Sequence, residues 1–190
     1  MNTKTKNLVG IGIFTAIVVV LQMLGGAIKV GGMFSISLVL IPIVVGAAVY
    51  GWKAGAWLGF VFGVAVLATG DAAAFLAVDP VATVVVVLLK GTVGGLLAGL
   101  CYKLMEKHSR FVAVLLAAVC CPVVNTGIFL VGCRLFFYET VAAWGAGLGF
   151  ENATAYMFLG LAGINFLVEL GVNIITAPVI VRLIRIGKKD

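Results

Sequence analysis

Apolar residues gather in six long runs, and short segments that carry most of the charge separate them. The runs cover residues 8–26, 34–50, 54–70, 80–102, 111–137 and 155–181. Each run is close to the ~20 residues that an α-helix needs to cross a hydrocarbon layer of about 30 Å. The alternating strands of about ten residues that are typical of a membrane barrel do not occur in the sequence. The pattern predicts an all-α integral membrane protein with six transmembrane helices in one domain, residues 1–190.

The composition supports a membrane location. The chain is 63% hydrophobic and only 11% charged, whereas a soluble domain carries about 25% charged residues. The net charge of +6 does not indicate a nucleic-acid partner, because the basic residues form short clusters between the apolar runs. Such clusters orient helices in a lipid bilayer and do not follow a phosphate backbone.

The basic residues also predict the orientation of the chain. Six spans place both termini on one side of the membrane, and that side would hold nearly all of the lysine and arginine. The basic residues on that side are Lys4, Lys6, Lys53, Lys103, Lys107, Arg110, Arg182, Arg185, Lys188 and Lys189. Lys29 lies on the opposite side, with Asp71, Asp79, Glu139 and Glu151. The positive-inside rule therefore predicts cytoplasmic N and C termini in a multi-pass protein of the cell membrane.

Prolines and connectors give local expectations. Asp79 and Pro80 have the residue types of an N-cap and a first helical position. Pro42 is expected to kink the helix over 34–50. The connectors "AIKVGGMF", "DAAAFLAVDP" and "YETVAAWGAGLGFENATA" are expected on the outer side. They are either plain links or mobile lids.

Small residues recur at helical spacing in two runs. Gly55, Gly59 and Gly63 form a stripe in "GAWLGFVFG", and Gly12 and Ala16 are four residues apart in "GIFTA". Such stripes allow two helix backbones to approach closely inside a membrane. The first stripe is expected to pack within the bundle. The second serves either an internal neighbour or another subunit.

Seven charged or amide side chains lie within the apolar runs. They are Gln22, Lys90, Asn125, Arg134, Asn165, Glu169 and Asn173. A charge at the centre of a bilayer costs about 2.5–3.5 kcal/mol even on insertion scales, so it indicates a functional site by default. Lys90 is ten residues past Pro80, which places it about 15 Å into the membrane at 1.5 Å per residue. Gln22 is expected to serve packing.

Helical spacing groups these side chains by face. Asn165, Glu169 and Asn173 are four residues apart and form one stripe, while Thr83 and Lys90 share a face of the helix over 80–102. The helices over 80–102, 111–137 and 155–181 are therefore expected to enclose a common interior site. Lys90 and Glu169 either form a structural ion pair there or hold a ligand.

Asn125 and Arg134 are the remaining candidate site residues. On an ideal helix, however, they would not share one face. They are nine residues apart, which places them on opposite sides at 3.6 residues per turn. Arg134 reaches the same site only if the helix is distorted, and otherwise its side chain extends to the outer interface.

The sequence lacks the patterns of common catalytic centres. His108 is the one histidine, it lies in a polar segment, and neither HExxH nor a Walker A motif occurs. The four cysteines show no CxxC spacing. We therefore expect neither an enzyme nor a bound metal or cofactor, and any energy for transport has to come from another subunit.

Two stretches resemble a known family. The segments "GIGIFTAIVVVLQ" and "YGWKAGAWLGFVFGVAVLATGD", with the six-run pattern, are similar to the S components, the substrate-binding subunits, of energy-coupling factor (ECF) vitamin transporters, and most similar to their pantothenate group. The resemblance implies a prokaryotic cytoplasmic membrane protein that works with a transmembrane coupling (T) subunit and two ATPases. It also implies that Gly12 and Ala16 contact the coupling subunit, with glycine where the family usually has alanine.

The resemblance implies a vitamin ligand, and the polar residues suggest its chemistry. Lys90, with Arg134 nearby, suits a carboxylate, while the asparagines suit amide or hydroxyl groups. Pantothenate carries all of these groups, and the few aromatic residues at this depth disfavour flat rings such as riboflavin. Biotin, a pyridoxine-type compound or a queuosine precursor remain alternatives. Two other functions also remain open: a non-transporting membrane scaffold that an ion pair between Lys90 and Glu169 holds together, and a small-solute channel.

Overall fold

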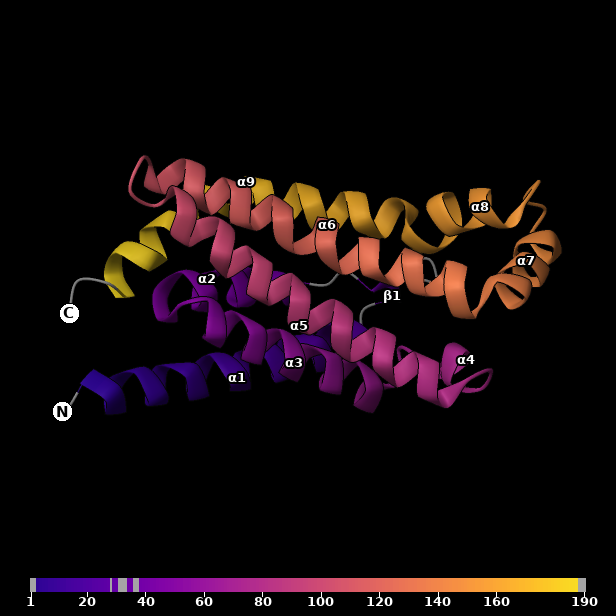
Figure 1. The fold of residues 1–190 in the computed structure, drawn as a ribbon, viewed down its shortest axis with the longest axis horizontal. Coiled ribbons are helices and arrows are strands. Elements are labelled where there is room, and N and C mark those ends of the chain that lie inside the picture. Colours follow the sequence, from indigo (N-terminus) through magenta and orange to yellow (C-terminus); the bar gives the residue numbers. More distant parts are fainter. Residues whose placement is uncertain (1–2, 28, 31–33, 36–37, 188–190) are drawn as a thin grey trace.

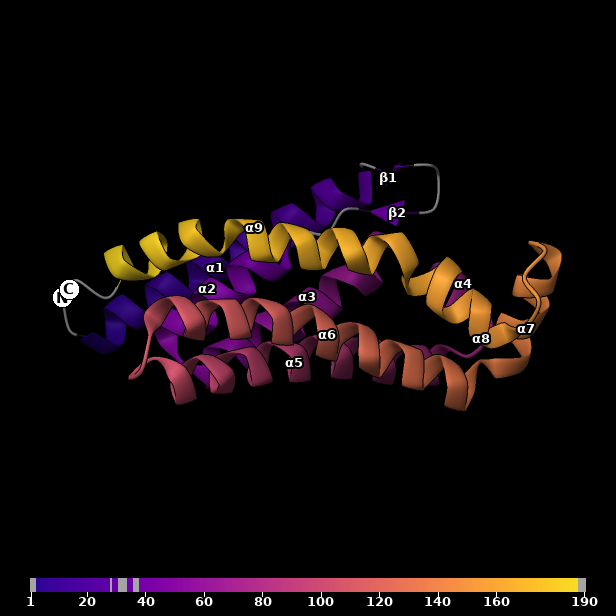
Figure 2. The ribbon, with the colours of Figure 1, turned by 90° about the horizontal axis from the view of Figure 1, so that it is seen from above.

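The protein is a bundle of long helices that run along one axis (Figures 1 and 2). The computed structural model describes residues 3–27, 29–30, 34–35 and 38–187. The long helices are α1 Thr3–Ala27, α2 Leu40–Tyr50, α3 Trp52–Thr69, α5 Pro80–Met105, α6 Arg110–Phe136 and α9 Ile164–Gly187. The short elements are β1 Lys29–Val30, β2 Phe34–Ser35, α4 Ala73–Leu76, α7 Tyr138–Gly147, α8 Ala153–Ala155 and the π-helix η1 Tyr156–Gly163.

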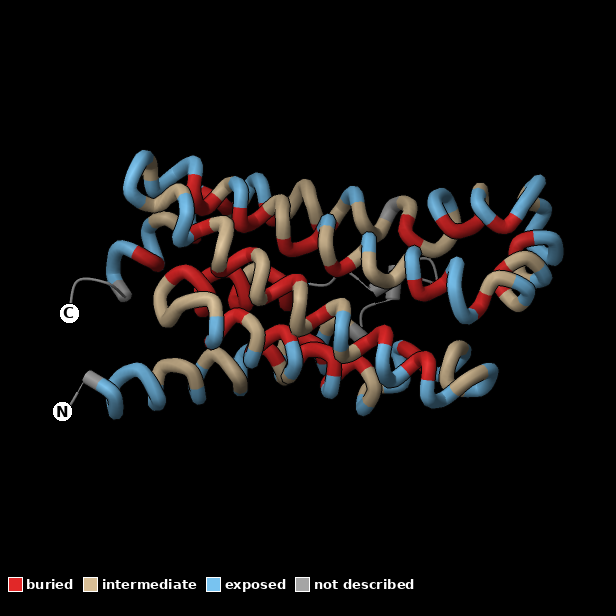
Figure 3. Tube along the Cα trace, viewed as in Figure 1, coloured by how far each residue is buried: buried red, intermediate tan, exposed pale blue. Residues whose placement is uncertain are grey.

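Among the described residues, five helical segments are long and apolar enough to cross a membrane. They are Lys4–Gly25, Trp52–Thr69, Pro80–Met105, Arg110–Phe136 and the continuous stretch Ala153–Ile186. Large apolar side chains such as Leu8, Leu135 and Ile175 are exposed along these segments, and exposed residues face outward around the bundle (Figure 3). A water-soluble monomer rarely exposes so much contiguous apolar surface. The predicted all-helical membrane architecture is thus supported.

The second predicted helix differs from its expectation. Helix α2 begins at Leu40 and not at residue 34, because Phe34–Ser35 form strand β2, which pairs antiparallel with β1. Its 11 residues rise about 16 Å at 1.5 Å each, which is short of a full span. Pro42 lies in the first turn and does not kink a longer helix, because the first-turn N–H groups have no intrahelical partner. The expectation of six full transmembrane helices is therefore not confirmed.

The first residues of α1 and the last residues of α9 lie at the same end of the bundle (Figure 1). We call this the terminal end, and we call the opposite end, where α4, α7 and α8 lie, the far end. Which side of the membrane each end faces stays a prediction from the distribution of basic residues.

Glycines bring α3 and α5 into direct backbone contact. A methyl group added at Gly59 would collide with the carbonyl oxygen of Gly91, and one added at Gly55 would collide with that of Gly95. The stripe on α3 therefore packs within the bundle, as expected, against a matching stripe on α5. This contact fixes the rotation of α5 and hence the direction of the side chains next to Gly91.

The start of α5 matches its predicted cap. The Asp79 carboxylate accepts a hydrogen bond from the Ala82 N–H at 3.0 Å, and Pro80 occupies the first turn. The connector before it contains α4, and the connector over 138–155 contains α7. Both are therefore more ordered than plain links. Of the connector between α1 and α2, residues 28, 31–33 and 36–37 lie outside the described residues.

Candidate functional site

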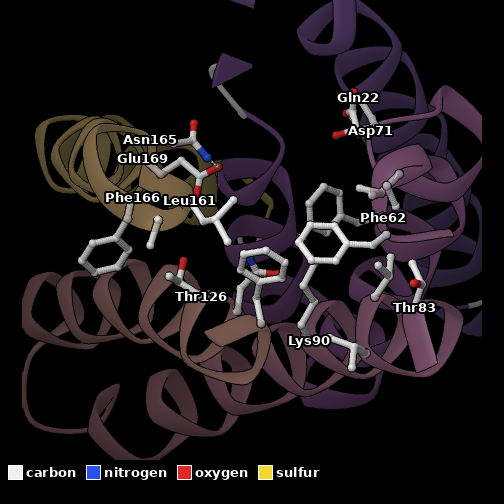
Figure 4. Close-up of a pocket in the computed structure, with 18 residues that line it drawn as sticks. Gln22, Phe62, Asp71, Thr83, Lys90, Thr126, Leu161, Asn165, Phe166 and Glu169 are labelled. Carbon is white, nitrogen blue, oxygen red and sulfur yellow. Dashed lines mark hydrogen bonds between the residues drawn. The ribbon is translucent and has the colours of Figure 1, made fainter. Parts of the chain in front are cut away.

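A cavity of about 190 Å³ lies inside the bundle, on the far-end side of the α3–α5 glycine contact. Its polar lining comes from the four helices α1, α5, α6 and α9 and from the turn after α3 (Figure 4). The polar side chains that line it are Gln22, Asp71, Thr83, Lys90, Asn125, Thr126, Asn165 and Glu169. Its aromatic lining consists of Phe62, Phe75, Phe129 and Phe166. A cavity of this size suits a small solute and not a macromolecule.

Five predicted site residues line this cavity together. They are Thr83 and Lys90 from α5, Asn125 from α6, and Asn165 and Glu169 from α9. The three helices named from the sequence therefore do converge. The Thr83 hydroxyl hydrogen is already used within the same helix, because it donates to the Asp79 carbonyl oxygen at 2.7 Å.

Two predicted site residues lie outside the cavity lining. Arg134 is exposed, and its guanidinium lies 4.0 Å from the ring centroid of Tyr138. Its position agrees with the alternative in which it extends outward, because α6 carries it on the face opposite Asn125. Asn173 is 1% exposed and donates from Nδ2 to the Glu169 carbonyl oxygen at 2.8 Å. It therefore supports the backbone of α9 behind the cavity.

Lys90 is held by aromatic rings. Its ammonium nitrogen lies 5.9 Å from the ring centroid of Phe62 and 5.2 Å from that of Phe129. A cation–π contact contributes about 0.5–2 kcal/mol, with the larger values for a desolvated cation, and Lys90 is half-buried. Within the described part of the chain, no direct ion pair joins Lys90 to Glu169. Of the two alternatives, the structural ion pair is thus not seen, and the lysine charge remains available to a ligand.

The α9 wall presents hydrogen-bond acceptors. The Asn165 Nδ2 group donates to Oε1 of Glu169 at 3.4 Å, and Glu169 is only 5% exposed. The side-chain oxygens of Asn125 and Asn165 are buried and receive no hydrogen bond from the described residues. Unpaired buried acceptors are costly, so these two atoms suit donors on a bound solute.

The sequence did not identify several residues of the lining. Gln22 was assigned to packing and Asp71 to a connector, yet they lie together on the wall opposite Asn165 and Glu169 (Figure 4). The expectation of few aromatic residues at this depth is wrong. Phe62 and Phe75 come from α3 and α4, outside the three helices considered, while Phe129 and Phe166 flank the polar positions on α6 and α9. A search for aromatic residues one turn from each polar one would have found these last two.

The rings near the cavity also form a cluster. Phe75 makes edge-to-face contacts with Phe129, Phe137 and Trp144, with centroids 5.6, 5.1 and 5.3 Å apart. Such contacts contribute about 0.5–1.5 kcal/mol each beyond burial. They connect α4, α6 and α7 at the far end of the cavity.

Apolar helices that enclose a small, charged and aromatic-lined cavity define a membrane protein that binds a small polar solute. The chain matches the family model described as "ECF transporter, substrate-specific component" over residues 6–181. The chain therefore belongs to this family of S components, which are substrate-binding parts of transporters and not enzymes.

A solved structure shares the fold. It is the structure of ThiT from Listeria monocytogenes, with a TM-score of 0.69 and 21% sequence identity. The match covers 97% of this chain and 96% of that one. No curated protein matches the chain. Neither the family model nor the fold places the chain in the pantothenate group.

Proposed function

We propose that this chain is the high-affinity substrate-binding subunit for uptake of a small water-soluble vitamin across a prokaryotic cytoplasmic membrane. The observation that carries the proposal is Lys90, a cation that forms no direct ion pair with a described carboxylate and that lines a cavity inside the bundle. A charge kept at this depth has to serve a ligand or a pathway. The cavity lies toward the far end, which the positive-inside rule assigns to the outer face.

Pantothenate is the first candidate ligand. Lys90 carries the only positive charge among the described residues that line the cavity, and it suits the carboxylate of this vitamin. The unpaired oxygens of Asn125 and Asn165 suit its two hydroxyl groups and its amide N–H.

A cationic aromatic vitamin such as thiamine is the second candidate. Asp71 and Glu169 place two carboxylates in the lining, and Phe62, Phe75 and Phe129 offer faces and edges for ring contacts. Aromatic faces attract cations and stack on flat rings. Biotin, pyridoxine-type compounds and queuosine precursors remain further members of the test panel.

Transport energy would come from a coupling subunit and two cytoplasmic ATPases. Gly12 and Ala16 are exposed on α1. A methyl group added at Gly12 would meet no other atom within 4 Å. A shallow apolar groove beside them is lined by Leu8, Ile11 and Trp57, among others. An open small-residue stripe of this kind suits close docking of a partner helix, as the family resemblance implies for this position.

The test is calorimetric titration of the detergent-solubilised chain with pantothenate, thiamine, biotin, pyridoxine and riboflavin. If pantothenate is the ligand, Lys90→Met should lower its affinity about 10- to 100-fold, because a hydrogen bond to a charged group contributes about 1.5–3 kcal/mol. Lys103→Met is the matched control, because Lys103 is an exposed lysine on the same helix.

Other titration results would support a different ligand or a different function. Thiamine binding that Lys90→Met leaves intact or strengthens would select the second candidate. Binding of no compound, by a chain that remains folded, would reject the vitamin-binding subunit. Uptake into vesicles without any ATPase would instead indicate a channel.

A further inference from the structure

A polar cluster joins the end of α1 to the turn after α3. The side-chain amide nitrogen of Gln22 donates to Oδ2 of Asp71 at 2.5 Å and to Oγ1 of Thr69 at 3.3 Å. Gln22 is only 4% exposed, whereas Asp71 is exposed. Both side chains line the cavity (Figure 4). A buried amide thus fixes the orientation of a carboxylate at the cavity edge.

The second carboxylate oxygen of Asp71 has no donor among the described residues. Gln22 is the donor to Asp71, and it contacts Oδ2 alone. An oriented carboxylate with one oxygen that accepts no hydrogen bond from a described residue is a preorganised acceptor for a donor on a ligand.

The cavity lining presents more hydrogen-bond acceptors than donors, which also favours a contact between Asp71 and a donor on the solute. Buried oxygens of Asn125 and Asn165 lack donors, and Asp71 and Glu169 add carboxylates. Lys90 supplies the ammonium group, from a different wall than Asp71 (Figure 4). A complementary solute therefore has several hydrogen-bond donors, and one of them faces the wall that Gln22 and Asp71 form.

We propose that Asp71, oriented by Gln22, is a specificity-determining contact that accepts a hydrogen bond from a hydroxyl or amino group of the transported solute. The solute would then be recognised by two charged side chains, Lys90 and Asp71, which lie on different walls of the cavity. Gln22 is a positioning residue that acts through Asp71. This inference rests on the proposed vitamin-binding function and adds the class of group that the solute presents.

The experiment compares probes that differ by one donor. Pantothenate is titrated beside analogues that lack either hydroxyl group, and thiamine is titrated beside the analogue that lacks its ring amino group. For the probe that binds, Asp71→Ala should lower affinity about 10- to 100-fold. The same variant should leave the affinity of one donor-lacking analogue unchanged. Glu139→Ala is the control, because Glu139 is an exposed acid of α7 outside the cavity lining.

Two further variants separate positioning from structure. Gln22→Met keeps the length of the side chain and removes the donor. It should reduce the preference for the intact probe over the donor-lacking analogue at least threefold. Asp71→Asn keeps an acceptor oxygen, so it should retain part of the affinity for a hydroxyl and less for a cationic group.

The outcomes are distinct. If the wild-type chain binds a probe and Asp71→Ala changes only the melting temperature, with every affinity unchanged, Asp71 is a fastener and the inference is overturned. If the wild-type chain binds no probe, the proposed function is overturned, and this inference falls with it.

Discussion

At the residue scale, Lys90 shows what a charged position in an apolar run reveals. Its depth and its membership of a common site follow from counting residues along one helix, and the cavity lining includes it as expected. Its neighbours do not follow from such counting. The stripe on α9 suggested Glu169 as a partner, whereas the ammonium lies over Phe62 and Phe129. Periodicity orients a side chain about its own helix axis and says nothing of the helix it meets.

The absence of a direct Lys90–Glu169 pair among the described residues gives a prediction for stability. Lys90→Leu and Glu169→Leu should each change the melting temperature, and the double variant should not recover the wild-type value. The two charges line one cavity and interact electrostatically across it, so their effects are not strictly additive, but without a direct ion pair neither substitution compensates for the other. Thermal unfolding in one detergent measures all three variants. Mutual rescue in the double variant would instead support a structural ion pair and the scaffold alternative.

At the element scale, the α3–α5 contact places Lys90. Gly91 follows Lys90 directly and touches the backbone of Gly59, so α5 cannot rotate without breaking that contact. The sequence predicted the stripe on α3 as interior, and the structure confirms it. The sequence did not predict that this stripe packs against the glycines of α5, because a stripe of small residues does not indicate which helix will contact it.

Gly59→Ala tests this contact. The added methyl group would collide with the Gly91 carbonyl oxygen, and overpacking of this kind destabilises by about 1–3 kcal/mol. We expect a lower melting temperature and weaker vitamin binding, because Lys90 moves with α5. Gly171→Ala is the control, since a methyl group there meets no atom within 4 Å. Equal melting temperatures for the two variants would contradict the prediction.

The cap of α5 gives a second element-scale prediction. Asp79→Ala removes the acceptor for the Ala82 N–H and should destabilise the protein by about 1 kcal/mol. Asp79→Asn keeps an acceptor at the same place and should remain close to wild type. Thermal unfolding of the two variants checks this. A loss of stability in Asp79→Asn as large as in Asp79→Ala would argue that charge, and not capping, is what matters.

At the scale of the whole molecule, α1 has two different sides. Gln22 is buried against Asp71, whereas Gly12 and Ala16 are exposed. Under the proposed function, we therefore expect ligand binding and subunit docking to use separate surfaces of this helix.

The double variant Gly12→Leu/Ala16→Leu should keep its vitamin affinity and lose co-purification with the coupling subunit and the ATPases. Bulky side chains on an open small-residue stripe prevent close helix approach without touching the cavity. Gly171→Leu on α9 is the control for added apolar bulk. Undiminished co-purification of the double variant would place the docking surface elsewhere.

The sequence by itself determined the helical membrane architecture, the start of α5 and five of the polar positions that line the cavity. These features depend on composition, on the spacing of residues along one helix and on local hydrogen bonds. Tertiary structure alone decided that α2 is short, that aromatic rings surround Lys90, and that Gln22 and Asp71 meet across 49 positions of the chain. The physical reason is that a cavity is made by contacts between elements, and no period along a single chain encodes which elements become neighbours.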